Sequence, residues 1–446
     1  MPITTRSPDS RGLSFHEEQA VSHSKTDVKL AEGQDDKVRK RILYLAHRVP
    51  YPPNKGDKIR SFNILKYLSQ RHELHLAALI DDAKDIAVLP ELRSQVTSLI
   101  YSRIDQAGRR LLSSRAILRS QSITVVHFYS RGLQSKIDDL IESTNFDVIL
   151  CSSSPIAEYL FRSRHWNARL KDIVKIMDLI DVDSYKWQQY AQISSMAKAW
   201  VYRYEARKLE QYEKKIYRAF DKLLLVSDRE KHYFPQPDNQ NKIRAVQNGV
   251  DLDYFSDSSQ RVPGSGGPAV VFTGMMDYWP NIEGVRWFIE EVYPAIRKAV
   301  PEVHFFVVGG RPSKEVSHWQ SLDGVTVTGF VPDVRTYLGK EDVCIVPLQI
   351  ARGIQNKVLE AMSMSKAIVS TPQALEGINL TLGEHALSAL DAREFAAAVV
   401  GLLRDRQMAD QIGQAARQFV EQHYSWEGNL RQLEEIILGK CLDTTR

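Results

Sequence analysis

The second half of the chain alternates short, β-branched apolar runs with longer stretches of helical spacing, and this alternation constrains the fold more than any other feature. The apolar runs predict strands at residues 269–273, 303–308, 325–328, 343–346, 367–370 and 386–390. Helical stretches such as 282–298 and 334–338 separate them. Strand and helix in regular alternation are typical of a parallel, doubly wound α/β sheet.

The first half of the chain carries a similar pattern. It predicts strands at 41–46, 74–80, 96–101, 147–151, 173–177, 222–226 and 243–246, and one long helix at 185–220. With 446 residues the chain exceeds what one hydrophobic core usually supports, so we expect two such domains. The expected division is a disordered tail at 1–38, a first domain at 39–255, a linker at 256–268, a second domain at 269–425 and a final helical segment at 426–446.

Charge and cysteine usage exclude several classes of protein. The formal net charge of +4 is small for this length and argues against a nucleic-acid footprint, which needs a concentrated basic face. The three cysteines, Cys151, Cys344 and Cys441, are widely spaced, which predicts free thiols in a reducing cytoplasm. No apolar run reaches membrane-spanning length, and the first forty residues lack the order of a signal peptide.

The stretch from Arg352 to Met362 follows a predicted strand and leads into helical spacing. In a parallel sheet a loop at this place lies where ligands bind, and the free N–H groups of the helix start face the ligand. Lys357 in the first helical turn opposes the helix dipole, a penalty that a bound anion would reverse. Glu360 lies on the same face and could accept hydrogen bonds from hydroxyl groups. The alternative is an exposed ion pair on an ordinary surface helix.

A second glycine-bearing loop follows the first strand, where three prolines precede Gly56 and a predicted helix. Gly56 would let the backbone approach a ligand closely, and Lys58 and Arg60 would add positive charge nearby. We expect Asp57 to be the helix N-cap rather than a ligand contact.

An acidic segment, Asp178 to Ser184, follows the strand predicted at 173–177. The spelling Asp181-Val182-Asp183 resembles a metal-binding pair, but three residues carry little information. We expect Asp183 or Ser184 to cap the long helix and predict no metal site here.

Residues 103–119 combine five arginines with several leucine and isoleucine residues against a single acid. A basic amphipathic segment of this kind predicts contact with an anionic membrane surface. The alternative is a solvated helix whose apolar residues face the core of the first domain.

The segment from Arg352 to Met362, continued to Gly377, resembles the nucleotide-sugar signature of the group 1, retaining, family-four glycosyltransferases of GT-B fold. Three further segments are similar to the same family, namely 246–251, 271–274 and 329–333. Within the family, residues 47–60 and 178–184 resemble the sugar transferases associated with exosortase (PEP-CTERM) and exopolysaccharide gene clusters. The resemblance covers nearly all of the chain after residue 37.

The resemblance implies two Rossmann-like, doubly wound α/β domains facing across a cleft. It implies a hexosyltransferase that needs no metal or cofactor and moves a sugar from a nucleoside diphosphate sugar to a polyprenyl-linked or glycan acceptor in exopolysaccharide synthesis. Such an enzyme would be cytoplasmic and peripheral on the inner membrane surface, through residues 103–119. Asp178 and Asp181 would contact the reacting sugar or the acceptor. The expected donor-binding residues are Gly56, Gly274, Phe330, Val331, Arg352, Gly353, Lys357 and Glu360.

Several positions depart from the family pattern. Arg352 replaces the first glutamate of a paired-glutamate motif, so only Glu360 carries over, as the ribose ligand. Met275 and a Pro280–Asn281 loop replace the usual arginine and lysine, and Ser365 stands where a glycine is common. The histidine that many relatives place near the reacting sugar is missing, which leaves the assignment of the catalytic residue open. Two alternatives therefore stay open. One is a catalytically silent scaffold of a polysaccharide assembly complex, and the other is a sugar epimerase or phosphorylase of GT-B fold.

Overall fold

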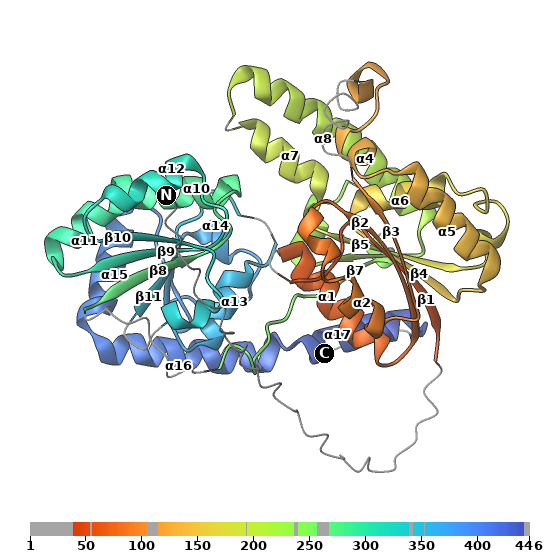
Figure 1. The fold of residues 1–446 in the computed structure, drawn as a ribbon. Coiled ribbons are helices and arrows are strands. Elements are labelled where there is room, and N and C mark those ends of the chain that lie inside the picture. The colour runs from red at the N-terminus through yellow and green to blue at the C-terminus, as the bar shows by residue number, and fades with distance from the viewer. Residues whose placement is uncertain are drawn as a thin grey trace, which may run out of the picture. The chain divides into compact units, whose positions relative to one another are not determined.

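The structure is a computed structural model of the 446-residue chain. It describes residues 39–53, 56–104, 115–192, 194–235, 240–256, 267–338, 342–351 and 353–440. The predicted tail at 1–38, most of the linker at 256–268, most of the basic segment at 103–119, and Arg352 lie outside the described residues. The described residues build two parallel sheets (Figure 1). We call the seven-stranded sheet with the helices packed on it the first lobe, and the six-stranded sheet with its helices the second lobe.

The first lobe has a seven-stranded sheet in the order β3-β2-β1-β4-β5-β6-β7. All neighbouring strands run parallel, and Ile42 of the first strand lies opposite both Leu74 and Val148. Both faces of such a sheet are covered, which explains why its strands read as continuous apolar runs. The strands are β1 (Arg41–Ala46), β2 (Glu73–Ile80), β3 (Ser98–Arg103), β4 (Val148–Ser152), β5 (Val174–Ile180), β6 (Lys222–Leu225) and β7 (Ile243–Ala245).

Helices pack on both faces of the first sheet. The helices are α1 (Gly56–Ser69), α2 (Leu89–Gln95), α4 (Ile123–His127), α5 (Arg131–Ser143), α6 (Ala157–Phe161), α7 (Asp183–Gln192), α8 (Met196–Ala219), α9 (Asp228–Tyr233) and α17 (Trp426–Ile437). Because side chains alternate along a strand, Ile42 and Tyr44 join the core under α1, α2 and α17, whereas Leu43 and Leu45 join the core under α5, α6 and α8. The last helix of the described chain therefore packs on the first lobe.

The second lobe has a six-stranded parallel sheet in the order β10-β9-β8-β11-β12-β13, around one large apolar core. Its strands are β8 (Ala269–Thr273), β9 (His304–Val308), β10 (Val325–Gly329), β11 (Asp342–Val346), β12 (Ala367–Ser370) and β13 (Leu387–Ser388). Its helices are α10 (Trp279–Trp287), α11 (Tyr293–Ala299), α12 (Lys314–His318), α13 (Asn356–Ser363), α14 (Pro372–Leu375), α15 (Ala392–Arg404) and α16 (Arg406–His423).

Short irregular helices complete the described elements. A π-helical turn, Phe288–Val292, joins α10 to α11 within the helix predicted at 282–298. The 3₁₀ helices are Ala83–Ile86, Ser154–Ile156, Arg169–Lys171, Gln240–Lys242, Trp319–Ser321 and Val334–Tyr337.

The long helix predicted at 185–220 is two helices, which corrects the sequence prediction. α7 ends at Gln192, and α8 begins at Met196 after an extended residue, Ser195. The two helices pack together, with the rings of Trp187 and Tyr202 5.1 Å apart between centroids. The aromatic spacing continues across the break, so periodicity could not reveal it.

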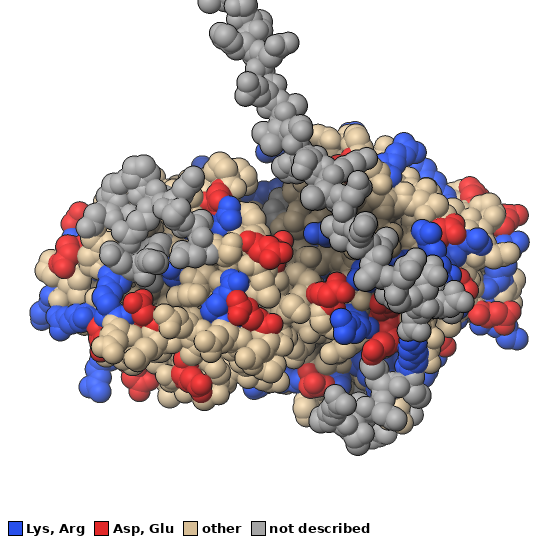
Figure 2. Space-filling view, turned by 90° about the horizontal axis from the view of Figure 1, so that it is seen from below, with Lys and Arg blue, Asp and Glu red and all other residues tan. Residues whose placement is uncertain are grey.

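Two features of the surface bear on the sequence predictions. On the face drawn in Figure 2, basic and acidic side chains are interspersed and do not form a patch of one sign. Among the residues that the structure describes, no helix combines the length and the apolar character needed to cross a bilayer.

Candidate functional site

The start of α13 is the centre of the candidate site. The helix buries Val358, Leu359 and Met362 against the sheet, which turns Lys357 and Glu360 to its other face. The N-cap residue, Gln355, makes no side-chain bond to the first helical turn, and its backbone oxygen accepts from the Val358 N–H at 2.9 Å. Before the helix, Gly353 has a φ of 60°, a conformation that favours glycine.

Lys357 is held against the first strand of the second lobe. Its ammonium donates a hydrogen bond to Asn281 Oδ1 at 2.7 Å and lies 4.3 Å from the centre of the Phe272 ring. A Cβ added at Gly274 would lie 3.0 Å from the lysine Nζ, so the glycine leaves room for the ammonium. Burial lowers the pKa of Lys357 to about 7, against the opposing charge of Glu360.

Glu360 lies one helical turn beyond Lys357 and is half-buried. Burial raises the pKa of its carboxyl group to about 7, and the charge of Lys357 acts in the opposite direction. Both side chains therefore lose contact with water, and their partners do not fully compensate for this loss. Perturbed ionisable groups on one helix face are a physical signature of a binding site.

The first lobe brings its glycine loop to the same place. A Cβ at Gly56, the first residue of α1, would lie 3.9 Å from Asn356 Nδ2, at the first residue of α13. The starts of two helices therefore meet beside Lys357. Both helix starts carry partial positive charge, which suits an anion between them.

Asp57 does not have the predicted capping role. The helix begins at Gly56, so Asp57 lies inside its first turn, and its carboxylate accepts bonds from His47 Nε2 at 2.9 Å and from Arg48 Nη1 at 2.6 Å. Burial alone would raise the pKa of Asp57, but the bonds and charges of His47 and Arg48 outweigh it and hold the pKa well below its usual range. The prediction from the sequence was wrong because the partners come from the preceding loop.

Asp178 and Asp181 lie in different surroundings. Asp178 is fully buried, and its two oxygens accept bonds from Arg60 Nε at 2.7 Å and Arg60 Nη2 at 2.8 Å. This arrangement does not favour the expected contact between Asp178 and a sugar. Between the two acids, Ile180 has a φ of 71°, which is unusual for a β-branched residue and marks a turn at the end of β5.

Asp181 lies beside the loop that precedes α13. A Cβ added at Gly353 would overlap Asp181 Oδ1, so Asp181 lies directly against this glycine. Asp181 also lines a small cavity together with Lys186, Tyr190, Tyr278 and Gln355. The hydroxyls of Tyr190 and Tyr278, two of the lining residues, lie 3.2 Å apart. Of the two predicted acids, Asp181 is therefore the one near the helix start.

Two further predicted residues, Phe330 and Val331, lie at the carboxyl end of β10. Phe330 is exposed and Val331 is half-buried, directly after Gly329, whose φ is 68°. A Cβ at Gly310 would lie 3.8 Å from Phe330 Cβ, so the exposed ring lies beside the loop after β9. Arg352, the last predicted donor-binding residue, lies outside the described residues.

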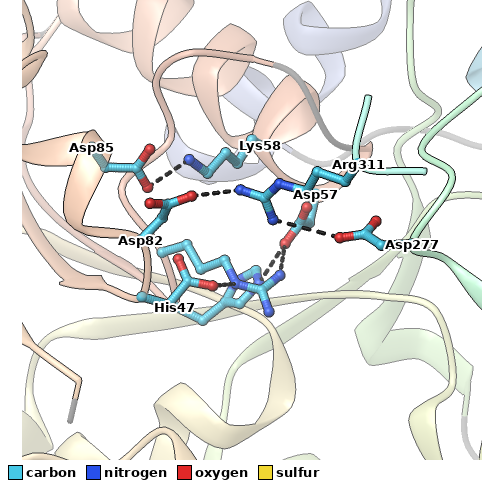
Figure 3. Close-up of polar contacts among 9 residues, drawn as sticks. His47, Asp57, Lys58, Asp82, Asp85, Asp277 and Arg311 are labelled. Atoms are coloured by element: carbon cyan, nitrogen blue, oxygen red, sulfur yellow. Dashed lines mark hydrogen bonds and ion pairs between the residues drawn. The ribbon is translucent and has the colours of Figure 1, made fainter. Parts of the chain in front are cut away.

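Several polar residues at the site were missed by sequence reasoning. Arg311 bonds Asp82 of the first lobe and lies 3.5 Å from Asp277 of its own lobe (Figure 3). No sequence motif marks Asp82, whereas Arg311 follows two glycines at a strand end, a signal that could have been used.

Two residues have other partners than the sequence predicted. Lys58, which was expected to add positive charge near a ligand, is buried, and its Nζ donates to Asp85 Oδ2 at 2.7 Å. Asp183, an expected cap, accepts a bond from Ser154 Oγ at 2.7 Å.

Among the described side chains, no group of three or more His, Cys, Asp or Glu residues is arranged to hold a metal ion. The described cysteines, Cys151 and Cys344, are buried, and neither forms a disulfide bond within the described residues. The described site offers hydrogen bonding and charge from Lys357, Glu360, Asp181 and two helix starts.

Comparisons with known proteins find a family model and a relative that match this chain. Residues 267–405, which include α13, match the family model of the group 1 glycosyl transferases. A Klebsiella pneumoniae protein described as an uncharacterized 44.6 kDa protein in the cps region is 22% identical over 399 residues, covering 86% of this chain and 96% of that protein.

Two solved structures are similar over most of the chain. Sucrose-phosphate synthase from Thermosynechococcus elongatus has a TM-score of 0.66 at 15% identity and covers 90% of this chain and 99% of its own. Anabaena HepE in complex with UDP-glucose has a TM-score of 0.62 at 14% identity and covers 90% of this chain and 100% of its own. At these identities the likeness shows the fold. The predicted α/β class, with two Rossmann-like, doubly wound parallel sheets of GT-B type, is confirmed.

Proposed function

We propose that the protein is a glycosyltransferase that moves a sugar from a nucleoside diphosphate sugar to an acceptor hydroxyl. The observation that carries this proposal is the pairing of Lys357 and Glu360 on one face of α13, both desolvated, beside the start of that helix. The family match includes this helix, and a structural neighbour binds UDP-glucose.

In this proposal the diphosphate lies at the start of α13. Its negative charge would keep the Lys357 ammonium protonated and accept bonds from the free N–H groups of the first turn. Gly274 and Gly353 leave space at this point, and Gly56 lets the start of α1 approach from the other side. Arg352 is the second cation that we assign to the diphosphate.

The nucleoside would extend along the second lobe. Glu360, one turn beyond the lysine, accepts hydrogen bonds from the ribose hydroxyls. The base lies near Phe330 and Val331, where an exposed aromatic ring and free backbone groups offer stacking and hydrogen bonds.

The transferred sugar would lie toward the cavity lined by Asp181. During transfer the bond between the anomeric carbon and the phosphate oxygen breaks and its electron pair stays on the phosphate. The acceptor oxygen bonds to the anomeric carbon on the same face, and its proton passes to the leaving phosphate, so configuration is retained without a metal or cofactor. Asp181 orients hydroxyl groups in this scheme, whereas Asp178 acts only through Arg60.

We further propose that the enzyme is a hexosyltransferase of exopolysaccharide synthesis, with a polyprenyl-linked or other glycan as acceptor. The cps-region relative supports a role in polysaccharide synthesis. We place the enzyme in the cytoplasm, on the inner face of the membrane, through the basic segment at 103–119. Binding to anionic vesicles, compared with neutral vesicles and with a variant whose five arginines there are replaced by glutamine, tests that placement.

The function is tested by donor binding and slow donor hydrolysis over a panel of nucleoside diphosphate sugars. We expect one donor to bind and to be hydrolysed, and expect Lys357→Ala to weaken binding about 10- to 100-fold, the effect of one charge-assisted bond. Lys298→Ala, an exposed lysine on α11, is the matched control and should change nothing. A protein that binds no donor of the panel would be a scaffold, and full donor affinity in Lys357→Ala would refute the assigned site.

A further inference from the structure

A chain of hydrogen bonds leads from the buried core of the first lobe to the start of α13. It begins at Arg60 of α1, whose side chain is fully buried and pairs with both oxygens of Asp178. The remaining terminal nitrogen, Nη1, donates to the backbone oxygen of Val246 at 2.8 Å and to Asn248 Oδ1 at 2.9 Å. A buried guanidinium with this many acceptors has one orientation available.

Arg60 thereby fixes the side chain of Asn248. Because the amide oxygen of Asn248 accepts from Arg60, its amide nitrogen faces the other way, and it donates to Asn356 Oδ1 at 3.2 Å. The backbone oxygen of Asn248 accepts a bond from Asn429 Nδ2 of α17 at 3.0 Å. Asn248 is therefore held by α1 and α17 and reaches across to the second lobe.

The same logic fixes the amide of Asn356, the first residue of α13. Its oxygen is engaged by Asn248, so its NH₂ group points toward Gly56, 3.9 Å from the position of a Cβ there. In the described part of the chain this NH₂ group donates no hydrogen bond. A half-buried donor with no acceptor, beside the starts of two helices, is suited to an anionic ligand.

We propose that Asn356 Nδ2 donates a hydrogen bond to the departing phosphate of the nucleoside diphosphate, and that Arg60, Asp178 and Asn248 are positioning residues that orient this donor. This inference rests on the proposed function. It adds a neutral donor to a site whose lysine also lies half-buried, and it gives the buried Arg60–Asp178 pair a role in the reaction.

The bond strengthens as transfer proceeds. Breakage of the bond between the anomeric carbon and the phosphate oxygen leaves the electron pair on that oxygen, which becomes a better acceptor for the Asn356 amide. An interaction that grows toward the transition state lowers kcat when it is removed and changes the donor KM little. This split separates the proposed role from one in folding or in binding alone.

The experiment measures donor hydrolysis and glycosyl transfer for Asn356→Ala, Asn248→Ala and the double variant. Removal of one preorganised donor to a developing charge costs roughly 10²- to 10³-fold in kcat, so we expect that loss in Asn356→Ala. Asn248→Ala should lose less, and the double variant should be no slower than Asn356→Ala, because Asn248 acts through Asn356. Asn63→Ala, on α1 with only a local bond to the Ile59 oxygen, is the control and should keep full activity.

The outcomes separate this inference from the proposed function. Wild-type protein that binds and hydrolyses a donor, together with an Asn356→Ala variant of unchanged kcat, would overturn the inference and leave the function standing. Additive losses in the double variant would remove Asn248 from the chain of bonds. Wild-type protein that neither binds nor hydrolyses any donor would overturn the proposed function itself. Thermal unfolding of each variant identifies any loss of activity that arises from loss of folded protein.

Discussion

The two lobes differ in how their charged side chains at the candidate site are paired. In the first lobe, Asp57 is paired with His47 and Arg48, and Asp178 is paired with Arg60. In the second lobe, Lys357 and Glu360 both have a pKa moved to about 7 because burial is not fully compensated. The comparison indicates that Asp57 and Asp178 have their charge partners within the first lobe, whereas we propose that a bound ligand compensates the burial of Lys357 and Glu360 in the second lobe.

The largest effect expected from this difference is on stability, and it should come from the first lobe. Arg60→Met leaves the fully buried Asp178 carboxylate without its partner, which typically costs about 3 to 5 kcal/mol of the free energy of unfolding. Denaturant unfolding measures this loss. Arg41→Met, which breaks the exposed pair with Glu73, is the matched control and should cost less than about 1 kcal/mol. Equal losses in the two variants would contradict a special role of the buried pair.

The opposite result is expected in the second lobe, where Lys357→Met should stabilise the unliganded protein. The folded pKa of Lys357 lies near 7, below the unfolded value near 10.5, so the charged lysine opposes folding below pH 10.5, most strongly below pH 7. The shift corresponds to about 5 kcal/mol at pH 6, and loss of the bond to Asn281 offsets about 1.5 to 3 kcal/mol of it, which leaves a gain of about 2 to 3 kcal/mol. In thermal unfolding, the variant should melt higher than wild type, and added nucleoside diphosphate should raise its Tm by less than it raises that of wild type. A lower Tm without ligand would contradict the comparison.

The strands of both lobes could be predicted from the sequence because parallel strands covered on both faces read as apolar runs. The predicted run at 269–273 coincides with β8, and the run at 41–46 coincides with β1. The helix start with Lys357 and Glu360 was also predictable, because its residues lie together in the sequence. The irregular break between α7 and α8 was not, because helical spacing persists on both sides of it.

The pairing of charges could not be predicted. Asp178 and Arg60 lie 118 residues apart in the chain, and Lys357 and Asn281 lie 76 apart. Spacing in sequence carries no information about which long-range partners meet. For this reason the sequence predicted a substrate contact for Asp178, and it predicted no role for the side chains of Asn248 and Asn356.

The pH dependence of nucleoside diphosphate binding should sharpen the same comparison. A bound anion favours charged Lys357, so binding takes up a proton and the affinity falls as pH rises through about 7. Ribose hydroxyls favour ionised Glu360, so the affinity also falls as pH drops through about 7. Calorimetric titration from pH 5 to 9 should show a maximum near 7 and a change of up to about tenfold per pH unit on each side. Lys357→Met should remove the decline on the alkaline side, and an unchanged decline would assign it to another group.

The smallest effect is expected where the two lobes touch through an exposed pair. Arg311 bonds Asp82 across the lobes, but its side chain is 46% exposed, so the pair is screened by water and salt. Arg311→Ala should therefore change the free energy of unfolding by less than about 1 kcal/mol, and the change should shrink further in 1 M salt. Arg297→Ala, which removes an exposed pair with Asp323 within the second lobe, is the control. A loss as large as that of Arg60→Met would mean that this exposed contact between the lobes stabilises the protein as much as the buried pair does.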